Sequence, residues 1–137
     1  MILRSDSRNQ AARRGVAAVE FAFVAPFLLA LVLGIIEFGR MLMVQEILVN
    51  ATREGAHAAI QPSETDAQVT AVVSNYLQAA GISGYTATLS PTLASGPASG
   101  TALTMTVSVP CATVSWLNYS TWFQGQSLSS NVTMMKE

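Results

Sequence analysis

Charged side chains are scarce in this sequence: only 11% of its 137 residues are Asp, Glu, Lys or Arg. About a quarter is usual for a soluble domain, and half of this chain is hydrophobic. The deficit of charge therefore predicts a membrane segment. Cysteine is almost absent as well, since Cys111 is the only one. A lone cysteine excludes an intrachain disulfide, a cysteine-based metal cluster and a CxxC redox motif, and we expect Cys111 to be a small buried hydrophobe.

Histidine is equally rare, and His57 is the only one. No cluster of Cys, Asp or Glu accompanies it, so we expect a surface or packing residue and no metal ligand. Serine and threonine are abundant after His57, but a Ser-His-Asp triad is excluded because no further histidine follows. Glu64 and Asp66 are interpreted as residues that favour the start of a helix, in preference to a catalytic acid/base pair. The sequence therefore predicts a protein that is not an enzyme and uses no cofactor or metal.

The few charges are distributed unevenly along the chain. Residues 1–15 carry four arginines and one aspartate, a balance of +3, whereas residues 16–137 carry three basic and seven acidic side chains, a balance of −4. A basic leader before an apolar run is a topology signal, because positive residues stay in the cytoplasm. The mild acidity of the remainder argues against binding to phosphate backbones, so no nucleic-acid partner is expected.

The longest apolar run is "FAFVAPFLLALVLGII", which covers sixteen residues from Phe21 to Ile36. Counting back to Val16 gives twenty-one residues, interrupted only by Glu20. A helix needs ~20 mostly apolar residues to cross the hydrocarbon core of a bilayer, so this run is long enough. Pro26 is expected to kink the helix without ending it. With the arginines in the cytoplasm, everything after Glu37 should lie on the far side of the membrane.

The helical pattern continues beyond the apolar run and stops before Pro62. We therefore predict one long helix over about 16–60, membrane-spanning to about residue 36 and projecting beyond it. Glu37 and Arg40 are three residues apart and can pair on the helix surface, for a few tenths of a kcal/mol at most if exposed. Apolar or small side chains recur along one side of the projecting half: Met41, Val44, Leu48, Ala51, Gly55 and Ala58 or Ala59.

Three of these residues, Ala51, Gly55 and Ala59, form a row of small side chains at every fourth position. Such a row lets another helix approach closely, which suits assembly with a partner. Equally, it suits packing against the second helix of the same chain, and the sequence leaves both alternatives open.

Residues 61–137 are expected to form a small extracytoplasmic α+β head. The stretch "PSETDAQVTAVVSNYLQAAG" begins with proline, capping-type residues and acids, and it continues at helical spacing, which predicts a helix. Two alternating runs, "SGYTATLSPTL" and "TALTMTVSVP", flank the tip "ASGPASG" and predict a hairpin. "SLSSNVTMM" is a candidate third strand of an antiparallel sheet. A head of this size buries little surface alone, so we expect it to dock against the projecting half of the long helix.

The aromatic residues of the head gather between the predicted strands. Trp116, Tyr119 and Phe123 could form one helical face. We favour core filling as their role over a ligand platform or a membrane-surface belt.

Glu20 needs an explanation, because an ionisable group at the entrance of a membrane span costs several kcal/mol unless it has a partner. The surrounding stretch "RRGVAAVEF", which ends at Phe21, resembles the processing site of type IV prepilins: a basic leader, a glycine, and glutamate as the fifth residue of the mature chain. The wider stretch from Gly15 to Ala59 is similar to the TadE-like family of pseudopilins and minor pilins, which accompany the Flp pili of the tight-adherence secretion machinery. The ending "NVTMMKE" is similar to that family's usual ending, whereas the middle of the head departs freely.

The resemblance implies that a prepilin peptidase cuts after Gly15 on the cytoplasmic side and removes the leader, residues 1–15. Glycine suits such a site because it lets the backbone lie extended in a narrow cleft. The cut would create an ammonium group on Val16, one helical turn before Glu20, and the pair is expected between neighbouring subunits. The alternative is an uncleaved anchor in which Glu20 reaches back to the cytoplasmic headgroups.

The expected fold is therefore α+β and pilin-like, with a long N-terminal transmembrane helix kinked at Pro26 and a head of one helix and an antiparallel sheet. The resemblance implies four partners: the prepilin peptidase, a second pseudopilin, the inner-membrane pilus assembly platform and membrane lipid. The major Flp pilin is a further candidate. The expected location is the bacterial inner membrane, single-pass, with incorporation into a surface pilus left open. The competing hypotheses are an uncleaved bitopic protein whose head binds an external partner and a membrane-anchored accessory to a secreted enzyme.

Overall fold

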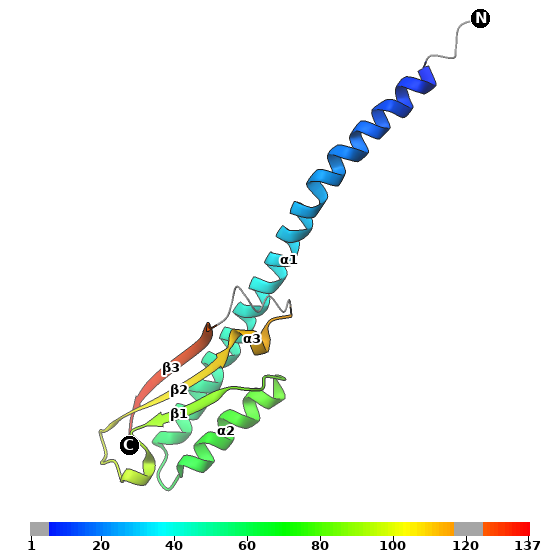
Figure 1. The fold of residues 1–137 in the computed structure, drawn as a ribbon. Coiled ribbons are helices and arrows are strands. Elements are labelled where there is room, and N and C mark those ends of the chain that lie inside the picture. Colours follow the sequence, from blue (N-terminus) through cyan, green and yellow to red (C-terminus); the bar gives the residue numbers. More distant parts are fainter. Residues whose placement is uncertain (1–5, 117–124) are drawn as a thin grey trace, which may run out of the picture. The chain divides into compact units, whose positions relative to one another are not determined.

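The computed structural model describes residues 6–116 and 125–137. It confirms the α+β prediction, with a long apolar N-terminal helix, a small helix and a three-stranded antiparallel sheet (Figure 1). The chain divides into two compact units, the first ending at Phe38 and the second covering Gly39–Glu137. The elements in chain order are α1 (Asp6–Ile60), α2 (Asp66–Ala79), β1 (Thr86–Ser90), η1 (Leu93–Ser95), β2 (Ala102–Pro110), α3 (Cys111–Val114) and β3 (Ser127–Met135).

Helix α1 begins at Asp6 and not at the predicted Val16. The leader holds four arginines and two alanines, which are good helix formers, and the single Gly15 costs only about 1 kcal/mol in a helix interior. The helix propensity of these residues therefore explains why α1 includes most of the basic leader. Pro26 lies inside α1, which continues to Ile60. The expectation that this proline does not end the helix is confirmed.

Helix α2 has a definite signal at each end. The Thr65 side chain accepts a hydrogen bond from the Gln68 backbone amide, and the Gln68 side chain accepts one from the Thr65 amide at 2.9 Å, which makes a capping box. At the other end Gly81 has a φ of 72°, and the Ile82 amide donates to the Leu77 carbonyl at 2.9 Å, as in a Schellman motif. The predicted helix between Pro62 and Gly81 is thus confirmed.

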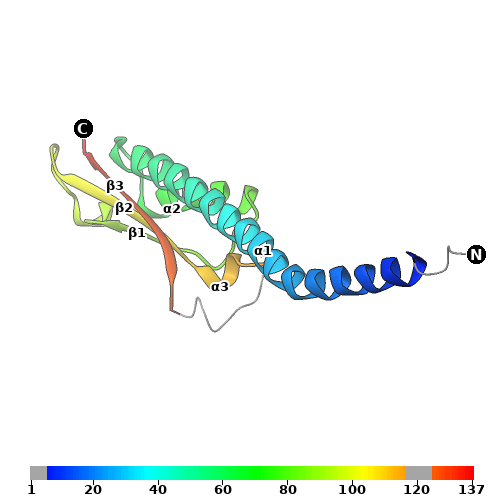
Figure 2. The same ribbon diagram turned by 90° about the horizontal axis from the view of Figure 1, so that it is seen from above.

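The three strands pair antiparallel in the order β1-β2-β3, which confirms the predicted hairpin and the third strand. Both ribbon views show β2 in the middle (Figure 1, Figure 2). Thr106 of β2 lies opposite Thr88 of β1 and Asn131 of β3. These residues face outward, because β2 alternates between buried and half-buried positions from Leu103 to Val109. The inward positions of β2 are Leu103, Met105, Val107 and Val109, all buried.

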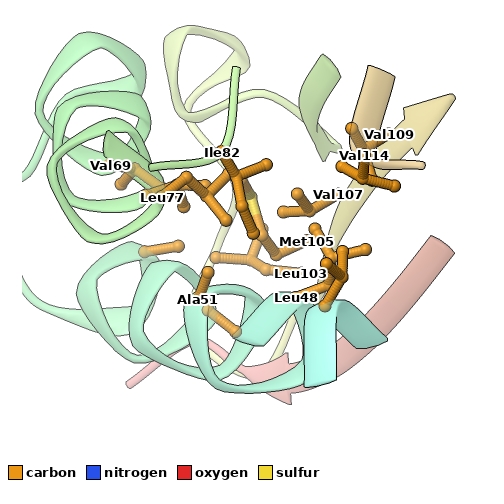
Figure 3. Packing of buried hydrophobic residues seen from close by; sticks show 14 residues of the cluster. Leu48, Ala51, Val69, Leu77, Ile82, Leu103, Met105, Val107, Val109 and Val114 are labelled. Carbon is orange, nitrogen blue, oxygen red and sulfur yellow. The ribbon is translucent and has the colours of Figure 1, made fainter. Parts of the chain in front are cut away.

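One hydrophobic core joins the second half of α1 to α2 and the sheet. Figure 3 shows Leu48 and Ala51 of α1 directed toward the same region as Leu77 of α2 and Met105 of β2. Only Glu37 and Thr52 are buried polar residues in the described parts of the chain, and the Thr52 hydroxyl donates to the Leu48 carbonyl at 2.6 Å. Residues 39–60 of α1 therefore supply one wall of the head's core, as expected of a head too small to build one alone.

Candidate functional site

The predicted processing motif lies on an exposed stretch of α1. All side chains from Arg13 to Glu20 are exposed, and so is Phe21. A Cβ atom built on Gly15 would meet nothing within 4 Å. Packing within the chain therefore does not require glycine at position 15, and its presence there needs another reason.

Glu20 lies four residues after Val16 on the same exposed helix, one turn away. Among the residues that the structure describes, none forms a hydrogen bond or an ion pair with the Glu20 carboxylate. Neither the fold nor a local ion pair accounts for a carboxylate at the start of the apolar run.

The apolar run itself is fully displayed. Helix α1 is the one helix in the described ranges that is long and apolar enough to cross a membrane, and none of the residues in its most apolar window is buried. Phe23, Phe27 and Leu29 are examples of large side chains exposed along it. Exposed apolar surface of this extent marks a membrane or protein interaction site, so the helix supports membrane anchoring.

Glu37 and Arg40 follow the apolar run and differ in environment. The Glu37 side chain is only 6% exposed, so the weak pairing energy expected of an exposed pair does not apply to it. The Arg40 side chain is half-buried, and its Nε donates a hydrogen bond to the carbonyl of Val114 in α3. Its guanidinium carbon also lies 4.7 Å from the centre of the Trp116 ring. Arg40 thus connects α1 to the segment that follows β2.

The small-residue row packs inside the chain. Ala51, Gly55 and Ala59 are all buried. A Cβ atom on Gly55 would lie 2.5 Å from Cγ2 of Val73 in α2 and 3.3 Å from Cγ of Met105 in β2. The sequence left two alternatives open for this row, and in the structure the row packs against the chain's own second helix. Close approach to α2 and the sheet explains the glycine at position 55.

Trp116 corrects a prediction about the aromatic residues. It is 70% exposed and lies beyond the end of α3 at Val114, so core filling is wrong for this side chain. Tyr119 and Phe123 lie outside the described residues. Cys111, by contrast, is buried and free, as predicted.

Sequence reasoning missed the second role of Asp66. Its carboxylate accepts hydrogen bonds from the backbone amides of Leu93 at 2.8 Å and Ala94 at 3.3 Å, at the start of η1. The sequence indicates only a helix-start acid, because the partners lie 27 and 28 residues away in a loop without a motif. In the described part of the chain, no three His, Cys, Asp or Glu side chains come together in a group that could hold a metal ion.

Comparison with known proteins gives one family. Residues 15–57 match the sequence model of the family described as TadE-like protein, which confirms the resemblance predicted from the sequence. The match relates this segment of the chain to Tad pilus proteins. No curated protein and no solved structure matches the chain. The matched segment begins at Gly15 and contains the exposed apolar run, Glu37, Arg40 and most of the α1 wall of the core.

Proposed function

We propose that this chain, which is TadE-like over residues 15–57, is a minor pilin or pseudopilin that a prepilin peptidase cuts after Gly15. The mature protein acts in the assembly of Flp-type tight-adherence pili. One observation carries the proposal: the family match begins at Gly15, the glycine that separates the basic leader from the apolar helix, and a side chain there would meet nothing within 4 Å. A glycine that the fold does not need, between two arginines and an apolar helix, is accounted for by recognition in a protease.

The helical state of the leader defines what the peptidase has to do. A protease cleft takes the chain in an extended form, so α1 must unwind locally around Gly15. Glycine is about 1 kcal/mol less favourable than alanine in a helix interior, so unwinding costs least at this position. Hydrolysis then breaks the bond between the Gly15 carbonyl carbon and the Val16 nitrogen. Water supplies the oxygen of a new carboxylate on Gly15, and Val16 gains an α-ammonium group.

The new ammonium group would supply a partner for Glu20, whose carboxylate has none among the residues that the structure describes. An α-amino group is largely protonated near neutral pH, so its charge is opposite to that of the carboxylate. Two charges in an apolar environment are costly apart and tolerable together. If the ammonium of one subunit meets Glu20 of its neighbour, subunits packed in any other register leave both charges unpaired. The pair would therefore set the axial register of an assembly.

The proposed topology follows from the charge pattern. The four arginines of residues 1–15 stay in the cytoplasm, the apolar run spans the inner membrane, and the head lies outside the cytoplasm. The partners are the prepilin peptidase, a second pseudopilin and the inner-membrane assembly platform, with the major Flp pilin as a further candidate. Retention in the inner membrane and incorporation into the pilus are the two alternatives for the mature subunit.

The intact mass of the protein extracted from membranes tests the proposal. We expect the natural chain to lack residues 1–15 and Gly15→Leu to retain them. Gly34→Leu is a matched control, because Gly34 lies in the same helix and a Cβ there would also meet nothing within 4 Å. This control should be cut normally. Retention of Arg13 and Arg14 in the natural protein, or normal cutting of Gly15→Leu, would refute the proposal and favour an uncleaved bitopic protein.

A further inference from the structure

We propose that Trp116 is an interfacial anchor, a side chain that inserts among phospholipid headgroups on the extracytoplasmic side of the membrane. The inference rests on the membrane insertion of α1 and goes beyond it, because Trp116 belongs to the head and is far from α1 in the sequence. It names a lipid-binding surface on the head, formed by Trp116 and Arg40.

The structure holds Trp116 outside the core. Cys111 and Val114 of α3 are buried, and the chain then leaves the core, so that Trp116 is 70% exposed. Arg40 contacts the chain at the point where it leaves the core after α3. The Arg40 Nε donates to the Val114 carbonyl, and its guanidinium lies 4.7 Å from the centre of the indole ring. The ring is therefore tied to one level of α1 without being buried by the head.

That level matches the headgroup region. Arg40 follows Ile36, the last residue of the apolar run, by four positions, which is about 6 Å along a helix. The polar region on each side of a bilayer is about 5–8 Å thick. When the apolar run fills the hydrocarbon core, Arg40 and the ring beside it lie among the headgroups. Tryptophan is enriched at this depth because its ring is apolar and its N–H is polar, and a guanidinium binds phosphate well.

The local charge also suits phospholipid. Between Glu37 and Glu46 the only charged residue is Arg40, and residues 111–116 carry no charge. Glu37, the nearest acid along α1, is only 6% exposed, so it is shielded from a phosphate outside the chain. Anionic lipid is therefore attracted to the single guanidinium beside the indole ring.

Depth-dependent fluorescence quenching tests the proposal in the full-length chain. The sequence has two tryptophans, so Trp122→Phe leaves Trp116 as the only one. The protein is reconstituted in vesicles of phosphatidylethanolamine and phosphatidylglycerol that contain lipids brominated at defined depths. We expect a blue-shifted Trp116 emission that is quenched most by bromine close to the headgroups. Phe27→Trp in a background of Trp116→Phe and Trp122→Phe is the matched control, and bromine near the bilayer centre should quench it most.

The two reporters separate the two ways of failing. If the Phe27→Trp reporter is quenched by bromine while Trp116 is quenched only by aqueous iodide, α1 is inserted and the anchor proposal is overturned. If neither reporter is quenched by bromine, membrane insertion fails and the proposal fails with it. A Trp116 emission that shifts with the ratio of protein to lipid, without bromine quenching, would overturn the proposal in favour of contact with a second copy.

Discussion

Gly55 offers the sharpest test of how the head packs on α1. In Gly55→Ala, the new Cβ would lie 2.5 Å from Cγ2 of Val73 and 3.3 Å from Cγ of Met105. A methionine can move, but Val73 is β-branched and has one strongly preferred rotamer in a helix, so it cannot swing away. Overpacking of this kind costs about 1–3 kcal/mol. Alanine also gains up to ~1 kcal/mol over glycine in a helix, and this gain hides part of the cost.

Gly39→Ala removes that ambiguity. Gly39 lies in the same helix and the same compact unit, and a Cβ there would meet nothing within 4 Å. Both variants gain the same helix propensity, so the difference between them isolates the clash. We expect the free energy of unfolding of Gly55→Ala to lie about 1–3 kcal/mol below that of Gly39→Ala.

The assay is urea unfolding of the full chain in detergent, monitored by circular dichroism. Equal values for the two variants, within about 0.5 kcal/mol, the usual scatter for surface substitutions, would refute the close packing of α1 on α2. A Gly55→Ala variant more stable than the natural chain would also refute the close packing, because alanine can stabilise the helix at this position only if its Cβ meets no neighbour.

Two further predictions concern single carboxylates. Glu20→Ala should be processed normally but should impair assembly, because the charge pair with the Val16 ammonium is lost; intact mass and counts of surface fibres measure this, and normal piliation would exclude the register role. Asp66→Ala should lower the free energy of unfolding by about 1–2 kcal/mol, since two amides lose a charged acceptor that is only partly shielded from water. Asp66→Ala should also speed hydrogen exchange at the Leu93 amide. Glu64 lies before the helix cap, so Glu64→Ala should change neither the free energy of unfolding nor the exchange at Leu93.

The local elements were largely readable from the sequence. Alternating β-branched residues around a Gly/Pro/Ser tip predict β1 and β2. Thr65 and Gly81 mark the two ends of α2. These signals work because capping, turn formation and strand alternation depend on residues a few positions apart. The start of α1 was missed, because nothing between Asp6 and Val16 opposes helix formation strongly enough to stop it.

Part of the candidate site was also readable. The apolar run indicates the membrane-spanning helix, and the family match begins at Gly15. Processing after Gly15 and the pairing of Glu20 stay predictions. The environments of Glu37, Arg40 and Trp116 were not readable, because their neighbours come from other parts of the chain. The residues of one short helical segment do not show which distant loop will pack against that segment.

The sequence by itself determined that α1 is apolar enough to span a membrane, that a basic leader and Gly15 precede it, and that a helix and three strands follow. Those properties depend on composition and short-range periodicity. Only the tertiary structure decided that Gly55 faces Val73 and that Trp116 leaves the core beside Arg40. A pattern of small or aromatic side chains shows what a surface can contact, but the partner is selected by which elements bury the most apolar area together, and that is a property of the whole fold.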